Sequence, residues 1–220
     1  MSNLPNPSEH HDRRAFLGRA ATAALGIGAS ATALREALAA PVDAQGADRW
    51  LSGLKGKYRQ LTDIFEPNDG FGFAYAHIFL ATQGPQPDAS AVVVLRHGGF
   101  PFALSDAIWE RYKIGQAMKI NDPATKAPAV KNPFFRQKPG ALLVDDMAID
   151  RLLGRGVIFG ACNIALQVQS GMLASQAGVT AEVALKEWTA GIIPGITVIP
   201  SGVWGVNRAQ MAGCTYCSGG

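Results

Sequence analysis

The stretch Gly156-Val157-Ile158-Phe159-Gly160-Ala161-Cys162-Asn163 is a short apolar run that ends in a thiol and an amide. Its apolar residues from 157 to 162 are continuous and do not alternate with polar ones, which is typical of a strand covered on both faces in a parallel sheet. Similar runs occupy 74–81, 91–95 and 196–200. The sequence therefore predicts parallel strands in these four places.

Segments with helix start and stop signals separate the later runs. Ser105 with Asp106 can cap one helix, and Thr180 can cap another that stops at Gly191. Further helices are expected at 144–153 and 204–212, with a short edge strand near 215–216. This alternation of strand and helix predicts a single α/β layered domain.

The N-terminus has the pattern of a cleavable export leader. Arg13 and Arg14 are followed by Phe16 and Leu17 and then by an uncharged small-residue stretch, which is typical of a twin-arginine signal peptide. We expect 1–39 to be the leader and the translocase that reads it to be a partner during export. The alternative, a cytoplasmic amphipathic helix, is disfavoured by the glycines in the stretch. The predicted location is periplasmic or otherwise extracytoplasmic.

Two segments lack regular patterns. Residues 40–70 are polar and Gly-rich, and we interpret them as a linker with one short helix around 50–58, so that the α/β domain covers 71–220. Residues 119–142 hold four prolines and five basic residues against one acid and predict an irregular insertion. The adjacent aromatics Phe134 and Phe135 favour a lid or an oligomer contact over a plain flexible loop.

Composition excludes several classes of protein. After removal of the leader the net charge is about +2, too small for a protein that tracks a nucleic-acid backbone. No apolar run beyond the leader approaches the ~20 residues that cross a bilayer. Motifs of P-loop, zinc-protease and lipase sites are absent. We therefore expect no nucleic-acid partner and no stable membrane span after cleavage.

The candidate site lies where the predicted strands end, because ligands of open parallel sheets bind outside the carboxyl ends of the strands. The residues that follow three predicted strands are Arg96-His97-Gly98-Gly99, Cys162-Asn163 and Ser201. A guanidinium, an imidazole, a thiol and a hydroxyl are thus expected along one edge.

Cys162 and His97 are the candidate catalytic residues. A helix is expected from about Ile164, and a thiol at a helix N-terminus has its thiolate stabilised by the dipole and by unpaired amides. The alternative is that Cys162 is a small buried apolar residue. His97 can pair with the thiolate, bind a metal or orient an anion, with Gly98 and Gly99 letting backbone amides approach a ligand; alternatively these glycines only form a tight turn.

Cys214 and Cys217 form a C-x-x-C motif close to the C-terminus. The spacing suits a redox disulfide, a plain disulfide or half of a zinc site. A metal would need Cys162 or a histidine as well. Because the chain after the leader holds three cysteines, an oxidising compartment leaves at least one thiol without an intrachain partner.

These residues and their order resemble the DsrE/DsrF-like sulfur-relay family. The resemblance rests on 156–163, on Ile193-Pro194-Gly195 and Pro200-Ser201-Gly202, on 209–216, and more loosely on 92–99. It implies a flavodoxin-like parallel sheet with helices on both faces, a homotrimer or homohexamer, and a strand-end cysteine that carries sulfur as a persulfide between protein partners. Only Cys162 matches that cysteine. The insertion at 119–142 and the export leader depart from compact, cytoplasmic members.

Three functions remain open from the sequence. The first is a periplasmic, sulfurtransferase-like sulfur carrier that uses Cys162, with Arg96, Gly98, Gly99, Asn163 and Ser201 binding the substrate. The second is a noncatalytic protein that uses the cysteines and His97 to bind a soft metal such as copper, or a cofactor. The third is an assembly subunit whose insertion forms the interface.

Overall fold

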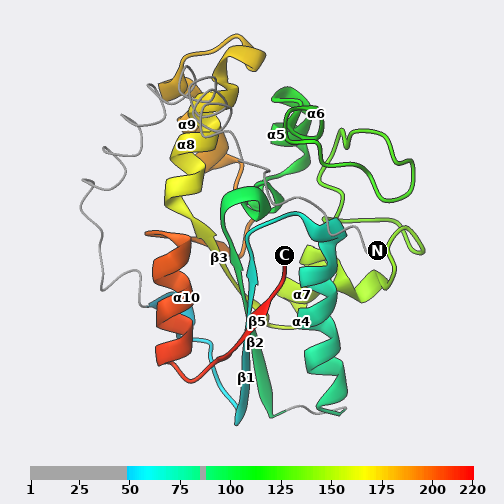
Figure 1. The fold of residues 1–220 in the computed structure, drawn as a ribbon, viewed down its shortest axis with the longest axis vertical. Coiled ribbons are helices and arrows are strands. Elements are labelled where there is room, and N and C mark those ends of the chain that lie inside the picture. Colours follow the sequence, from blue (N-terminus) through cyan, green and yellow to red (C-terminus); the bar gives the residue numbers. More distant parts are fainter. Residues whose placement is uncertain (1–48, 85–87) are drawn as a thin grey trace, which may run out of the picture.

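The computed structural model describes residues 49–84 and 88–220. Five parallel strands form one sheet in the order β4-β3-β2-β1-β5. Their bounds are Tyr58–Ile64 for β1, Ala89–Leu95 for β2, Ile158–Cys162 for β3, Ile196–Ile199 for β4 and Thr215–Ser218 for β5. Helices flank the sheet, which makes this a flavodoxin-like α/β domain, as predicted (Figure 1).

The helices follow the strands along the chain. They are α4 at Phe71–Thr82, α5 at Asp106–Arg111, α6 at Ile114–Met118, α7 at Ile149–Gly154, α8 at Asn163–Leu173, α9 at Ala181–Ala190 and α10 at Gly202–Met211. Short 3-10 turns cover Arg49–Leu51 (η1), Asn68–Gly70 (η2), His97–Ala103 (η3), Asp145–Met147 (η4) and Ala174–Ala177 (η5).

The two faces of the sheet have different cores. Side chains of a strand alternate between faces. Val93 and Leu95 therefore join a large cluster with α4 and most other helices, whereas Val92 and Val94 join a small one under α10. Figure 1 shows α10 on one side of the sheet and α4 on the other. The central strands β2 and β3 are thus covered on both faces, which explains their continuous apolar runs, whereas β4 and β5 at the sheet edges keep exposed residues.

Most of the predicted elements are confirmed. Strands occupy 89–95, 158–162 and 196–199, and the short strand near 215–216 lies at the edge beside β1. The side chain of Thr180 accepts from the amide of Val183 at the start of α9, and Gly191 ends that helix. The helix expected at 144–153 is divided into η4 and α7.

The prediction of a strand at 74–81 is wrong, because this segment belongs to α4. A short apolar run does not distinguish a buried strand from a buried helix by periodicity alone. The twelve residues of α4 bury Phe73, Ala76 and Leu80, which are spaced as one helical face.

The interpretation of 40–70 as a linker with a helix around 50–58 is also wrong for the described part. The described part of 40–70 holds only the short 3-10 helices η1 and η2, and 58–64 form β1, which pairs with both β2 and β5. The sheet therefore begins before residue 71. Thr62 and Asp63 are polar, so the sequence of this strand shows no continuous apolar run, although both residues are buried.

The insertion at 119–142 is irregular, as predicted, apart from a single bridge between Asn121 and Pro128. Phe134 and Phe135 are buried within the chain, however, so they supply no exposed lid or oligomer contact. The ring of Phe134 lies against Phe73 and Phe102, at 5.5 and 5.2 Å between ring centroids. The insertion is therefore anchored in the large core.

Two predictions about the N-terminus lie outside the described residues, namely the leader at 1–39 and cleavage near residue 40. Within the part of the chain that the structure describes, no helix combines the length and apolarity needed to cross a membrane.

Candidate functional site

A pocket of about 360 Å³ lies at the carboxyl ends of β2, β3 and β4. Arg96 follows β2, Cys162 ends β3 and Ser201 precedes α10, and all three line it. His97 lines it as well, so the structure brings together four of the residues that the sequence placed on this edge. Its other walls are largely apolar and come from α8 and the start of α10, at Ile164, Ala165, Val168, Gly202 and Val203.

Cys162 is the residue immediately before α8 and serves as its N-cap. The amide of Ala165 donates to its Sγ at 3.4 Å. The thiol is only 6% exposed, so the pocket is its route to other molecules. The first two amides of α8 have no acceptor within a helix, so this end of α8 favours negative charge.

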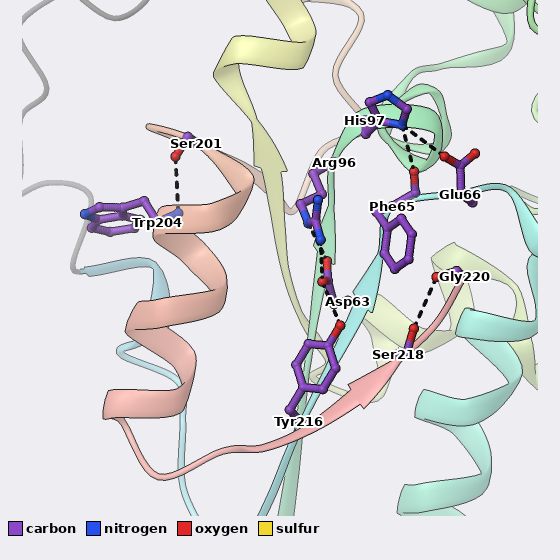
Figure 2. A network of polar contacts seen from close by, with 10 residues as sticks. All are labelled: Asp63, Phe65, Glu66, Arg96, His97, Ser201, Trp204, Tyr216, Ser218 and Gly220. Atoms are coloured by element: carbon purple, nitrogen blue, oxygen red, sulfur yellow. Dashed lines mark hydrogen bonds and ion pairs between the residues drawn. The ribbon is translucent and has the colours of Figure 1, made fainter. Parts of the chain in front are cut away.

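Arg96 is held by a buried carboxylate. Its Nε and Nη2 donate to the two oxygens of Asp63 at 2.8 Å each, and the hydroxyl of Tyr216 donates to the same carboxylate at 3.1 Å (Figure 2). The guanidinium also lies 4.9 Å from the ring centroid of Phe65. Asp63 is 1% exposed, which makes this a desolvated pair with fixed geometry.

Electrostatics around Arg96 follow from this pair. The hydrogen bond with Asp63 is the largest cause that raises the pKa of Arg96 above its ordinary value, and Tyr216 and Cys162 contribute smaller increases. The two hydrogen bonds to Asp63 use Nε and Nη2 of Arg96. The third nitrogen, Nη1, has no acceptor within residues 49–84 and 88–220. Arg96 can therefore still donate to an anion.

Ser201 caps α10 as Cys162 caps α8. Its Oγ accepts from the amide of Trp204 at 3.2 Å (Figure 2). The next residue, Gly202, touches the side chain of Arg96, because a Cβ at this position would lie 2.3 Å from Arg96 Cβ. The missing side chain thus allows the start of α10 to pack against the aliphatic part of the Arg96 side chain.

Gln169 is a pocket residue that sequence reasoning missed. Its Nε2 donates to the backbone carbonyl of His97 at 2.7 Å. Its Oε1 is buried and receives no hydrogen bond from the residues that the structure describes. Gln169 is 9% exposed and lines the pocket. An unsatisfied buried acceptor of this kind lowers the stability of the fold.

His97 lines the pocket, but its imidazole lies away from the thiol. The ring Nδ1 is 3.2 Å from Glu66 Oε1 and 3.3 Å from the carbonyl of Phe65 (Figure 2). In the described chain no hydrogen bond joins this ring to Cys162. The structure therefore does not bring the two predicted catalytic residues into a pair.

The remaining predicted residues lie beside the pocket and do not line it. A Cβ on Gly99 would lie 2.3 Å from the carbonyl oxygen of Ile64, and one on Gly98 would lie 2.8 Å from Glu66 Oε2. These glycines therefore let η3 approach the end of β1. Asn163 is the first residue of α8 and is half-buried.

Of the C-x-x-C cysteines, Cys217 lies on β5 and Cys214 immediately precedes that strand. Cys214 is buried in the small core, Cys217 is half-buried, and all three thiols of the described chain are free. Three extended residues span about 10 Å and point the two side chains to opposite faces. A disulfide needs Cα atoms closer than about 7 Å. Within residues 49–84 and 88–220, no three His, Cys, Asp or Glu side chains form a cluster that could hold a metal.

Burial predicts slow reaction of these two thiols. Burial is the largest cause that raises the pKa of Cys214, and it is the one cause that raises the pKa of Cys217. Each thiol therefore remains protonated at a higher pH than the thiol of an exposed cysteine. We expect iodoacetamide at pH 8 to label both more slowly in the native protein than in urea. The native rate should still be rising at a pH where the rate in urea has levelled off, because burial raises the pKa of both thiols. Labelling followed by peptide mapping measures this, and equal native and unfolded rates would contradict it.

Comparisons with known proteins show no family. No family model matches the chain, and no curated protein does. Among solved structures, a protein of unknown function from Methanobacterium thermoautotrophicum matches with 17% identity and a TM-score of 0.40. The match covers 74% of this chain and 99% of that one.

Proposed function

We propose that this protein is a sulfur carrier that holds sulfane sulfur as a persulfide on Cys162. The observation that supports this most strongly is the position of the thiol in the pocket, at the N-terminus of α8, with Sγ accepting the amide of Ala165. A persulfide is an anion, and the helix end and the Nη1 of Arg96 supply partial positive charge and donors. The family resemblance of 156–163 and 193–216 points in the same direction.

The transfer is a pair of displacements with no net oxidation. The Cys162 thiolate attacks the outer sulfur of a donor persulfide, an S–S bond forms, and the donor's inner sulfur leaves as a thiolate with the electron pair. A thiolate of an acceptor protein then attacks the outer sulfur of the Cys162 persulfide. Cys162 leaves as a thiolate and is regenerated.

The setting of this activity is part of the proposal. The arginine pair at 13 and 14 supports export by the twin-arginine translocase, and the family resemblance supports a homotrimer or homohexamer. The carrier would then meet its donor and acceptor outside the cytoplasm.

Polysulfide treatment tests the proposal directly. Intact mass of the wild-type protein should rise by about 32 Da, one sulfur atom, and peptide mapping should place it on Cys162. Cys162→Ser keeps an N-cap side chain and should lose the adduct, because serine also caps helices well. Cys217→Ser is the matched control and should retain it. An adduct of equal yield on Cys162→Ser would contradict the proposal.

A further inference from the structure

The pocket beside Cys162 is apolar and much larger than one sulfur atom. Most of its lining comes from apolar residues of α8 and of the start of α10, namely Ile164, Ala165, Val168, Gly202 and Val203. Its volume of about 360 Å³ lies at the small end of the pockets that hold organic ligands. A single persulfide sulfur would leave most of this space to water against apolar side chains, which is unfavourable. The pocket therefore fits a larger, apolar occupant.

The polar side chains around the pocket are engaged elsewhere. Gln169 Nε2 donates to the carbonyl of His97 at 2.7 Å, and Gln169 Oε1 is buried. Ser201 Oγ accepts the amide of Trp204. The imidazole of His97 is largely exposed and lies 3.2 Å from Glu66 Oε1. A ligand that depends on several hydrogen bonds would lose its bonds to water and replace few of them here.

The lining of the pocket also carries little net charge. Among the described residues that form it, Arg96 alone has a permanently charged side chain, and the buried carboxylate of Asp63 pairs with it at 2.8 Å. Moving an anion out of water into such a place is unfavourable. Chains of inorganic polysulfide are anions, whereas a ring of sulfur atoms is neutral and apolar. The pocket therefore favours the ring.

We infer that the pocket binds a neutral ring of sulfur atoms, such as cyclooctasulfur, as a sulfur donor to Cys162. This rests on the proposed function and adds a class of donor to the persulfide described there. The ring combines two properties that the pocket requires, an apolar surface and S–S bonds that a thiolate attacks. The thiol of Cys162 is 6% exposed and is reached through the pocket, so a ring held against Ile164 and Val168 meets it there.

Ring opening balances without a leaving molecule or a co-reactant. The Cys162 thiolate attacks one ring sulfur and forms an S–S bond to it, while one S–S bond of the ring breaks. The electron pair of the broken bond goes to the far end of the new chain, which becomes an anionic sulfur. A thiolate of an acceptor protein then attacks the sulfur bonded to Sγ. The chain passes to the acceptor, and Cys162 leaves as a thiolate.

Cyclooctasulfur added from acetone tests the inference on the purified protein. Intact mass should rise by about 256 Da, eight sulfur atoms, or by smaller multiples of about 32 Da once the chain is shortened, and peptide mapping should place it on Cys162. Inorganic polysulfide is the comparison donor, and each rate is divided by the rate of the same donor with free cysteine. The ring should then be preferred at least about tenfold, because the pocket buries its apolar surface.

Two variants on α10 separate the pocket lining from general charge effects. Val203→Lys places a cation and its water on the lining, so it should slow the ring several-fold and speed polysulfide. Met211→Lys places the same charge at the other end of α10 and should leave the preference unchanged, although the two residues are equally exposed, at 68% and 69%. Circular dichroism controls for folding. A preference that survives Val203→Lys would contradict selection by the lining.

Binding without reaction distinguishes this inference from the proposed function. In Cys162→Ser the ring should shift the amide resonances of Ile164, Val168 and Val203, and acetone alone should not. An adduct from polysulfide with none from the ring, or equal normalised rates for the two, would overturn the inference and leave the sulfur carrier standing. Ring binding in Cys162→Ser with no adduct from either donor on the wild-type protein would support the apolar ligand and overturn the sulfur-carrier function.

Discussion

Asp63→Ala should lower the free energy of unfolding by about 3 kcal/mol, because it leaves the Arg96 guanidinium without its carboxylate in a largely desolvated place. Both fork hydrogen bonds and the one from Tyr216 disappear together. The side chain of Arg96 remains 27% exposed, so water relieves part of the penalty and the loss belongs at the lower end for buried pairs. Urea denaturation followed by circular dichroism measures it.

Two controls distinguish the ion pair from simple loss of contacts. Tyr216→Phe removes one of the hydrogen bonds and should cost about 1 kcal/mol. Arg96→Met in the Asp63→Ala background removes the orphaned charge and should recover part of the stability. If Asp63→Ala costs no more than Tyr216→Phe, the pair does not act as described.

Phe134→Ala should lower the free energy of unfolding by about 3 to 4 kcal/mol, the usual cost of emptying an aromatic core position. Phe134 is 3% exposed and contacts both Phe73 and Phe102. Its ring also covers Gly70, where a Cβ would lie 2.2 Å from the ring. Denaturant titration of the purified variant gives the value.

The matched control lies in the same insertion. Val130 is exposed, and Val130→Ala should change the unfolding free energy by less than about 0.5 kcal/mol. A small effect at both positions would mean that 119–142 opens without disturbing the core, as a lid does.

The sequence predicted the later part of the fold better than the earlier part, for physical reasons. The runs at 91–95 and 157–162 are apolar because both faces of the central strands are covered, and such runs are easy to recognise. The run at 196–200 was recognised although it forms an edge strand in which Thr197 and Val198 are exposed. β1 carries Thr62 and Asp63 in buried positions, and no local pattern distinguishes it from a loop. The error at 74–81 arose because α4 carries apolar residues such as Tyr75 and Ile78 on its exposed face as well, which removes the helical periodicity from the sequence.

The candidate site was predictable where it depends on topology alone. Strand ends of a parallel sheet share one edge, so Arg96, Cys162 and Ser201 could be grouped without coordinates. Asp63 and Gln169 act through contacts 33 and 72 residues apart in sequence, which only the folded chain reveals. Asp63, as the one carboxylate in 58–64, was the one available signal. No feature of the sequence indicated that the His97 ring would point toward Glu66.

The distribution of thiols across the sheet bears on how a sulfur carrier of the proposed kind would release its sulfur. Cys162 ends β3, whereas Cys214 and Cys217 belong to the region of β5, three strands and about 14 Å away across the sheet. A resolving thiol must touch the outer sulfur to attack it. Within the described chain no cysteine can close a disulfide onto Cys162, so a persulfide there should persist until another molecule removes it.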